Sequence, residues 1–553
     1  MKHLLLLLLI LPFSLLSADS WTVLIYMAAD NNLAENGKQN IREMEAAHQP
    51  EDLNLIVQAD FPNEDARRYR IVHDQSPTQI NSPILDNLGR IDSGDPQTLK
   101  DFILWGKGRY QADHYMLVIW SHGDSWYKNN KWISPDYDTG NMIGIANGEL
   151  RGALTGSGPW DILLFDACSM QALEIITEIN DLTDYVVASA DLVPDTGFPY
   201  SNIIPILSQD PQEIASQIPD LYIDSYLPGG IHNPSQSYLT TTCSAISTAD
   251  WDAFLQSWKS LSRSVRTHSA ELLSIRQDLF EMNTGYADVD VRQLLIHLQN
   301  YGITEADPIL NLWNEHVLAS GFTLPYPETD IGTAALWFPD IRFNYDSAWQ
   351  HYMKLDFAKT GWLGAVNACL DDAPAAPDPP SVISQNVLID HLILRFAAPL
   401  SPDSLYYRLS LDDEEHLIFP PAYSPEFSFS TQVSNSGNYS IRAIDQNGLE
   451  SFALTNSYTL SESEEDVLLI YPNPLQDAIA GKLIWKHQPG EKLSVSIFNI
   501  KGQRVLHKAY PEDVWAGELA LMDLNGITEL VRGIYLVSLK NGNRSLRCKL
   551  TIL

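Results

Sequence analysis

The chain has few cysteines for its length, four in 553 residues, and they stand at Cys168, Cys243, Cys369 and Cys548. Four cysteines are too few for a disulfide scaffold in a chain of this size. One disulfide between Cys243 and Cys369 stays open, because the sequence does not show whether the two lie close together. Hydrophobic cores must therefore hold the chain together, and its length suggests about three or four domains.

Basic residues are also scarce. The sequence holds 35 Lys and Arg against 70 Asp and Glu, which gives a formal net charge of −35. Binding to duplex nucleic acid needs basic patches that neutralise phosphates, so we expect no nucleic-acid partner. An acidic surface instead attracts cationic peptides.

Long apolar runs are missing after the N-terminus. Residues 4–13 are apolar, follow the basic start Met1-Lys2-His3 and precede small residues, which predicts a secretory signal peptide over 1–18. No later segment has 18 consecutive apolar residues, so no transmembrane segment is expected once the signal is removed. Zinc motifs, a Gly-x-Ser-x-Gly elbow and phosphate-binding loops are absent as well.

The region from 19 to 372 alternates apolar strands with helical segments. Such alternation predicts an α/β fold with a mostly parallel sheet flanked by helices. The expected strands cover residues 21–27, 53–59, 115–120, 162–165 and 185–188, and the clearest helices cover 33–47, with Asn32 as N-cap, and 97–106.

Cys168 follows the apolar strand 162–165, and a helix is expected to start near Ser169. A lone cysteine is more often part of a core than a nucleophile. However, the N-terminus of a helix favours the thiolate, and the strand 115–120 ends in Ser121-His122-Gly123. If the two strands are parallel neighbours, His122 and Cys168 meet at the carboxyl edge of the sheet. The pair then predicts nucleophilic catalysis, with the N–H groups of Gly123 and Cys168 stabilising an oxyanion.

The remaining third of the chain is β-rich. A Pro-rich linker at 373–380 precedes short alternating strands over 381–460, which indicate a β-sandwich. Its ending GNYSIRAIDQNGLES at 437–451 resembles the last hairpin of fibronectin type III domains. An acidic linker at 461–466 leads to a second sandwich over 467–553. Its YPNP start, its I-x-N-x-x-G turn and its final G-x-Y-x-V strand resemble the C-terminal sorting domain of the type IX secretion system. The fold class is thus an α/β domain followed by two all-β sandwich domains.

The first domain resembles the clostripain family of cysteine peptidases, which are relatives of caspases. The resemblance rests on YMAADNNL at 26–33, IWSHG at 119–123, DACSM at 166–170, ASADLVPDTGFPY at 188–200, CSAIS at 243–247 and ALWFP at 335–339. It implies a caspase-like fold and peptide-bond hydrolysis in which Cys168 attacks the scissile carbonyl and His122 protonates the leaving amine.

The same resemblance implies cleavage after Arg or Lys. Asp166 corresponds to a carboxylate of the family's specificity pocket, although a strand-end Asp can equally be a capping residue. Asp191 and Asp195 follow the next strand and could supply a second carboxylate for substrate binding. Many family members have Glu in the segment that reads Ser189-Ala190-Asp191 here, so basic specificity is an expectation that needs a test.

Residues 124–159 join the two catalytic strands. Family members can cleave themselves in this interval, where the basic residues are Lys128, Lys131 and Arg151. Residues 136–141 (DYDTGN) faintly resemble a calcium loop, with the glycine one place too early for an EF-hand. No cofactor is required by the expected chemistry, and a calcium ion stays open with its ligands unknown.

We therefore expect a secreted cysteine endopeptidase, at the extracellular or outer-membrane surface of a Bacteroidetes-type bacterium. Its expected partners are peptide or protein substrates and the type IX secretion machinery, and the chain is expected to be a monomer. Two alternatives remain, namely an inactive surface protein for binding or adhesion, and a caspase-fold hydrolase of a different amide.

Overall fold

The structure is a computed structural model, and its chain divides into two compact units, Met1–Ala375 and Ala376–Leu553. The described residues are 19–126, 132–235, 237, 239–282, 287–323, 331–371, 377–388, 391–399, 405–411, 414–420, 425–444, 450–460, 467–471, 482–486, 493–509, 516–520, 530, 533–541 and 544–552. Several predictions lie outside them: the signal peptide at 1–18, Lys128 and Lys131, the acidic linker at 461–466 and the YPNP motif after Tyr471.

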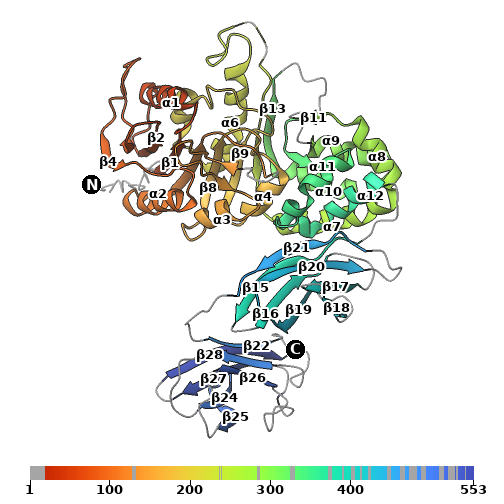
Figure 1. Ribbon diagram of the computed structural model, residues 1–553. Coiled ribbons are helices and arrows are strands. Elements are labelled where there is room, and N and C mark those ends of the chain that lie inside the picture. Colours follow the sequence, from red (N-terminus) through yellow and green to blue (C-terminus); the bar gives the residue numbers. More distant parts are fainter. Residues whose placement is uncertain are drawn as a thin grey trace, which may run out of the picture. The chain divides into compact units, whose positions relative to one another are not determined.

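The first unit is built around a nine-stranded sheet with the strand order β13-β10-β9-β8-β5-β1-β2-β3-β4 (Figure 1). Its five central strands run parallel, and antiparallel strands complete both edges. The nine strands are β1 (Trp21–Ala28), β2 (Leu53–Asp60), β3 (Ala66–Arg70), β4 (Ile84–Gly89), β5 (His114–Trp120), β8 (Trp160–Asp166), β9 (Thr183–Ala188), β10 (Thr242–Ser247) and β13 (Val317–Phe322).

Helices connect these strands and form most of the rest of the first unit. They are α1 (Ala34–Ala46), α2 (Pro96–Arg109), α3 (Glu149–Leu154), α4 (Leu173–Ile179), α5 (Tyr200–Ile203), α6 (Pro211–Tyr226), α7 (Trp251–Val265), α8 (Ser269–Asp278), α9 (Val291–Asn300), α10 (Ala306–His316), α11 (Arg342–Tyr352) and α12 (Trp362–Asp371), with 3₁₀ turns η1 (Ile204–Ile206), η2 (Arg266–His268) and η3 (Asp356–Thr360). Short strands are β6 (Trp132–Ile133), β7 (Ile143–Gly144), β11 (Glu281–Met282), β12 (Asp288–Asp290) and β14 (Ala335–Trp337).

Strand β1 shows how the sequence covers both faces of the sheet. All eight of its residues are buried, and successive side chains of a strand point to opposite faces. Val23 and Ile25 belong to the core cluster that includes Ile41 of helix α1. On the other face, the ring of Tyr26 lies 6.1 Å from that of Phe102 in helix α2. Helices therefore pack on both sides, which explains why β1 is apolar without alternation.

The second unit contains only β-structure among its described residues. In its first half, the sheets β15-β16-β19 and β18-β17-β20-β21 enclose a core that includes Leu394, Phe396, Leu409 and Ile441. In its second half the sheets are β22-β23-β26 and β25-β24-β27-β28. The strands are β15 (Ser381–Leu388), β16 (His391–Ala397), β17 (Tyr406–Leu411), β18 (Glu414–Ile418), β19 (Glu426–Gln432), β20 (Gly437–Ile444), β21 (Leu454–Tyr458), β22 (Val467–Tyr471), β23 (Lys482–Lys486), β24 (Leu493–Asn499), β25 (Arg504–Ala509), β26 (Ala516–Ala520), β27 (Gly533–Asn541) and β28 (Arg544–Ile552).

The pairing of Cys243 with Cys369, which the sequence left open, is not formed, because both are buried free thiols. Two local expectations differ from the structure. The helix expected from Ser169 begins at Leu173 as α4. Asn32 does not cap helix α1; Asn31 accepts a hydrogen bond from the N–H of Leu33 instead, at 2.9 Å. No helix in the described part of the chain is long and apolar enough to cross a membrane.

Candidate active site

Strands β5 and β8 bring His122 and Cys168 to one edge of the sheet. They are parallel neighbours in a register that pairs Trp120 with Asp166, and the N–H of Ser121 donates to the carbonyl of Asp166 at 3.2 Å. The segments that follow the two strands therefore leave the sheet side by side. His122 and Cys168 line the same cavity of about 50 Å³, together with Leu33, Trp120, Ser121, Asp166, Ala167, Val193, Pro194, Asp195 and Gly197.

Cys168 lies on a tight turn rather than at a helix N-terminus. Ser169 adopts a positive φ of 57°, and its N–H donates to the carbonyl of Asp191 at 3.0 Å. The Sγ of Cys168 accepts a hydrogen bond from the N–H of Val193 at 3.3 Å. The loop after β9 thus lies against the thiol.

The expectation of a lowered thiol pKa is wrong for this resting arrangement. Burial raises the pKa of Cys168 to about 11, and the carboxylates of Asp166, Asp191 and Asp195 raise it further against the opposing hydrogen bond from Val193. The expected help from a helix N-terminus is absent, because α4 begins five residues after the cysteine. The raised pKa favours the protonated thiol over the thiolate.

His122 is oriented by a residue that was expected to be a helix cap. Its Nε2 lies 2.7 Å from the Oδ1 of Asn32, an amide oxygen that accepts, so Nε2 carries the proton. The hydroxyl of Tyr137 donates to the same oxygen at 3.1 Å. Burial lowers the pKa of His122, and the charge of Asp195 opposes that effect. The sequence indicates this contact only through the position of Asn32 just after β1, because β1 ends at the same edge of the sheet as β5.

Gly123 allows the two catalytic segments to approach closely. A Cβ at this position would meet the carbonyl oxygen of Cys168 at 2.5 Å and the Cβ of Ala167 at 3.0 Å. Gly123 also forms a β-bridge with Ile133, which holds its backbone in place. The structure therefore places both predicted oxyanion donors, Gly123 and Cys168, in backbone contact, while their role stays a prediction.

Asp166 lies in the wall of the cavity and is 3% exposed. Its Oδ2 accepts hydrogen bonds from the hydroxyl of Tyr200 at 2.8 Å and from the N–H of Phe198 at 3.2 Å. Burial raises the pKa of Asp166 to about 6 against these two hydrogen bonds. Gly197 packs on the carboxylate so closely that a Cβ there would lie 2.7 Å from Oδ2.

The other two acidic candidates differ in position. Asp195 lines the cavity beside Cys168. Asp191 is buried outside that lining; its Oδ1 accepts from the N–H of Leu192 at 2.7 Å, and its own N–H donates to Thr242 at 3.3 Å. Asp166 and Asp195 therefore line the cavity, whereas Asp191 is buried outside its lining.

Three further carboxylates come together at the same edge of the sheet. Asp30, Asp60 and Asp136 each offer an oxygen within 4.8 Å of the others, in an arrangement that could hold a metal ion. Of the loop 136–141 that resembles a calcium loop, only Asp136 belongs to this group. The sequence did not connect it with Asp30 and Asp60, because the three are far apart along the chain.

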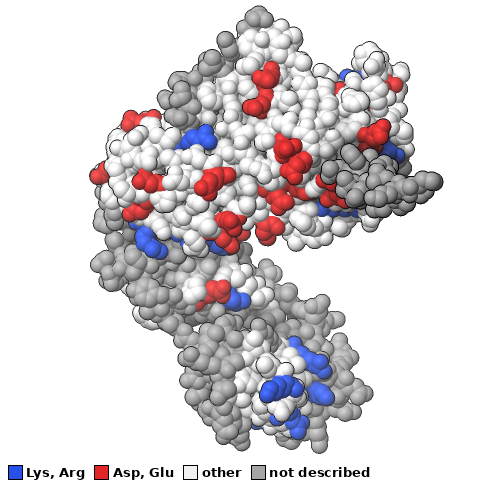
Figure 2. Space-filling view, turned by 180° about the vertical axis from the view of Figure 1, so that it is seen from behind, with Lys and Arg blue, Asp and Glu red and all other residues white. Residues whose placement is uncertain are grey.

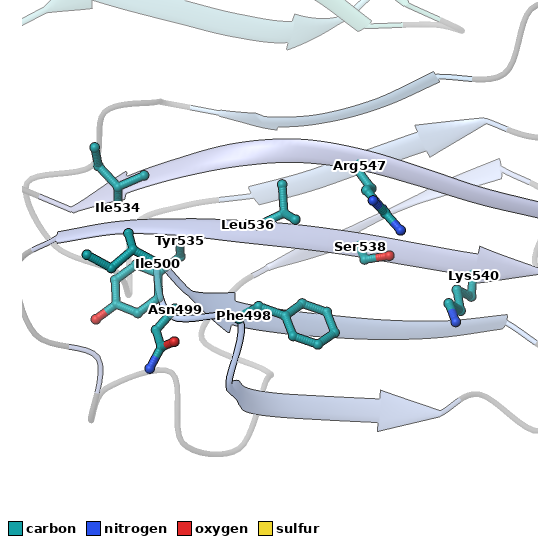
Figure 3. A pocket seen from close by; sticks show the side chains of 10 residues that line it. Phe498, Asn499, Ile500, Ile534, Tyr535, Leu536, Ser538, Lys540 and Arg547 are labelled. Atoms are coloured by element: carbon teal, nitrogen blue, oxygen red, sulfur yellow. The ribbon is translucent and has the colours of Figure 1, made fainter.

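A larger cavity, of about 590 Å³, lies in the second unit and is lined by residues of the neighbouring strands β24, β27 and β28 and of the turn after β24 (Figure 3). The described residues of its lining are Phe498, Asn499, Ile500, Gly502, Ile534, Tyr535, Leu536, Ser538, Lys540 and Arg547. Among these described residues there is no cysteine, histidine or carboxylate, and so no catalytic pair. On the face drawn in Figure 2, acidic side chains are scattered over the first unit, whose described residues form no large basic patch there.

Comparisons with known proteins agree with this arrangement. The model of the clostripain family matches residues 25–301, which is 277 of 553 residues, and the model of the secretion system C-terminal sorting domain matches 469–553. Clostripain from Hathewaya histolytica is 28% identical over 215 residues, which cover 33% of this chain and 41% of that protein. The chain thus spans less than half the length of this curated relative.

Two solved structures share the fold of the first unit. One is an inactive zymogen C11 protease from Parabacteroides distasonis, with 21% identity, a TM-score of 0.50 and coverage of 63% of this chain and 99% of that one. The other is a secreted C11 cysteine protease from Bacteroides thetaiotaomicron in complex with an irreversible peptide inhibitor, with 22% identity, a TM-score of 0.51 and the same two coverages. The expected caspase-like fold is confirmed, and so is the C-terminal sorting domain.

Proposed function

The chain belongs to the clostripain family of cysteine peptidases, and from this premise we propose that it is an exported cysteine endopeptidase in which His122 and Cys168 form the catalytic dyad. The single observation that carries this proposal is the shared cavity at the ends of β5 and β8, which both side chains line. The expectation of export is confirmed by the sorting domain at 469–553.

The reaction uses the two side chains in turn. The Sγ of Cys168 attacks the scissile carbonyl carbon as a thiolate, and its proton passes to His122. His122 then protonates the leaving amine as the C–N bond breaks, which leaves an acyl group on Cys168 as a thioester. Water hydrolyses the thioester, and the thiol regains its proton. Because Nε2 of His122 faces Asn32, Nδ1 is the nitrogen that is left for this exchange.

The oxyanion that forms on attack needs donors that are already in place. Gly123 and Cys168 have backbones in close contact at the edge of the sheet, and their N–H groups are our candidates. A side chain at position 123 would occupy the space beside the carbonyl of Cys168. The proposal therefore predicts that glycine is needed at position 123 for catalysis.

We propose that the residue before the scissile bond is Arg or Lys. Asp166 and Asp195 line the cavity, and with Asp191 they raise the pKa of the Cys168 thiol. A cationic side chain bound beside these carboxylates would offset their charge and so favour the thiolate that attacks. The same carboxylates would then explain both why the site prefers a basic residue and how substrate binding activates the Cys168 thiol.

The test uses peptides that differ only at this residue. We expect Arg and Lys substrates to be cleaved, and citrulline, Gln and Asp substrates to be cleaved about a hundredfold more slowly or not at all. The isosteric substitution Asp195→Asn should reduce the preference for Arg over citrulline. Equal or faster cleavage of the citrulline peptide by the wild type would contradict the basic pocket.

The two alternative functions give different results in the same assay. An inactive surface protein for binding or adhesion would cleave none of the peptides, whereas a hydrolase of a different amide would cleave a non-peptide amide in a Cys168-dependent way.

We keep self-cleavage within residues 124–159 as a proposal, with Arg151 as the candidate among described residues. Its guanidinium is paired with Asp181 at 2.7 Å, so this site must open before it can be cut.

The partners also belong to the proposal. The sorting domain implies the secretion machinery as one partner, and the cavity implies peptide or protein substrates. The monomeric state remains a prediction. The proposed catalytic steps use side chains and backbone N–H groups of this chain together with water, so a calcium ion would act on structure rather than in a bond-making step.

A further inference from the structure

The loop after β9 forms part of the cavity wall through a tight turn at residues 194–197. The N–H of Gly197 donates to the carbonyl of Pro194 at 2.9 Å, and Gly197 has a positive φ of 70°. Pro194, Asp195 and Gly197 all line the cavity. This hydrogen bond fixes the shape of the turn but not its distance from Cys168, so other parts of the chain must place it.

Asn40 of helix α1 joins this turn to the strand that leads to His122. The residue is 2% exposed, and its Nδ2 donates to the carbonyl of Thr196 at 3.0 Å. Its Oδ1 accepts a hydrogen bond from Nε1 of Trp120 at 2.9 Å. An indole can only donate and a carbonyl can only accept, so the two partners fix the orientation of the amide. Trp120 ends β5 and also lines the cavity.

Tyr226 of helix α6 holds the same turn from a second helix. Its hydroxyl donates to the carbonyl of Gly197 at 2.6 Å and lies 2.8 Å from Oγ1 of Thr196. Tyr226 is fully buried. The two carbonyl groups that follow Asp195 are therefore bonded to buried side chains of α1 and α6. A shift of the turn would leave these polar groups unpaired inside the protein, which is costly.

The helix itself does not explain an asparagine at position 40. Asparagine is a weaker helix former than most apolar residues, and a buried amide needs hydrogen-bond partners. The buried face of α1 also contains Ile41 and Met44, so packing alone would favour another apolar side chain. Within the helix, Nδ2 of Asn40 has only a long contact of 3.4 Å with Glu43 among the described residues. The bonds to the turn and to β5 therefore account for the amide.

We propose that Asn40 is a positioning residue for substrate preference, because it holds the turn that carries Asp195 in a fixed place relative to the end of β5. This inference rests on the proposed function, in which a basic residue of the substrate lies beside Asp195. Asn40 is not among the described residues that line the cavity, so it acts through Thr196 and Trp120. Its loss should misplace Asp195 more than it disturbs the attack by Cys168.

Asn40→Ala in the full-length protein tests this role with two readouts. The first compares otherwise identical Arg and citrulline peptides. We expect the ratio of their kcat/KM values to fall about tenfold or more, because the Arg peptide loses its placed carboxylate, while cleavage of the citrulline peptide changes little. The second is amide hydrogen exchange in the Cys168→Ala background, which does not depend on activity. Exchange should become faster at residues 192–198 and stay as in the parent at β5.

Gln39→Ala is the matched control, because Gln39 is the exposed neighbour of Asn40 in the same helix. It should behave like the wild type in both readouts. If Asn40→Ala does not fold, Tyr226→Phe serves in its place, because it removes only the hydroxyl that bonds to the turn. An equal loss of activity toward both peptides, or an unchanged ratio in the folded variant, would overturn the positioning role.

Failure of the proposed function gives a different result. A wild type that cleaves neither peptide would contradict the peptidase assignment, and hydrogen exchange would then decide alone whether Asn40 holds the turn. Faster exchange at residues 192–198 in the Asn40→Ala variant would support this hold, and unchanged exchange would overturn it.

Discussion

At the scale of single residues, Asn32 connects the loop after β1 with the catalytic histidine. It is exposed, and its Oδ1 lies 2.7 Å from Nε2 of His122. A side chain in this position selects the tautomer of the imidazole and holds the ring in one orientation. Its effect should therefore appear in catalysis rather than in stability.

The substitution Asn32→Ala should lower kcat by about ten- to a hundredfold, because His122 loses the partner that orients it. KM and the melting temperature should change little. Steady-state kinetics and thermal unfolding check both expectations. Asn87→Ala is the control, since this exposed asparagine bonds with Asp65 away from the cavity. A drop in melting temperature that accounts for the lost activity would contradict a positioning role.

Glu174 shows how burial changes a single carboxyl group. Burial raises its pKa from 4.5 to about 7, against a hydrogen bond from the N–H of Trp337. A carboxyl whose pKa is raised by folding stabilises the protein fully below its unfolded pKa, and this contribution is lost as the pH rises through 7.

Glu174→Gln should therefore remove a pH-dependent loss of stability. Between about pH 5 and pH 8.5, the wild type should lose roughly 2–3 kcal/mol relative to this variant, from a shift of about 2.5 pKa units. Urea unfolding at the two pH values measures the difference. Glu271→Gln, at an exposed position of helix α8, should leave the pH dependence as it is in the wild type. If the wild type and both variants lost the same stability between the two pH values, the raised pKa of Glu174 would be refuted.

At the scale of elements, the site depends on two parallel strands that end at the same level. Their apolar runs predicted two strands that lead to His122 and Cys168, and β5 and β8 are parallel neighbours, while the catalytic role of the two residues stays a proposal. Parallel order could be predicted because strands alternate with helices. The residue at which α4 starts could not be predicted from the sequence, because the turn at Ser169 depends on the carbonyl of Asp191 in the loop after β9. The raised pKa of Cys168 also arises from burial and from carboxylates brought in by folding.

Gly123→Ala tests the close approach of these two segments. The added Cβ would lie 2.5 Å from the carbonyl oxygen of Cys168, so the backbone that carries both predicted oxyanion donors must shift. We expect the folded fraction of this variant to lose about a hundredfold in kcat/KM. Gly108→Ala in helix α2 is the matched control, because a Cβ there meets nothing within 4 Å. Wild-type activity of Gly123→Ala would contradict the proposed geometry.

At the scale of the whole molecule, two compact units divide the tasks. The first unit holds the sheet and the cavity, and the end of the second matches a sorting domain. Sequence motifs could predict both, because each motif is a short stretch that can be read without the fold. The Asp30, Asp60 and Asp136 cluster could not be predicted, since its residues are far apart along the chain, in the loop after β1, at the end of β2 and in the segment after β6. The limits predicted for the individual domains, 19–372, 381–460 and 467–553, stay proposals.

Deletion of residues 461–553 should separate export from activity. The shortened protein should hydrolyse the peptide substrates in cell lysates, because no residue of the proposed dyad or cavity lies in the deleted part. It should no longer reach the medium or the cell surface, because the sorting domain is lost. Fractionation followed by immunoblotting and peptide assays checks this. Normal export of the shortened protein would mean that another segment directs it.

The most direct test of the central claim is peptide hydrolysis by Cys168→Ala. With purified proteins and an Arg-containing fluorogenic peptide, we predict that this variant loses activity by about a thousandfold or more. Cys548→Ala, which removes another free cysteine, should keep the wild-type rate. Folding of each protein is checked by circular dichroism. Hydrolysis by folded Cys168→Ala at the wild-type rate would contradict the account.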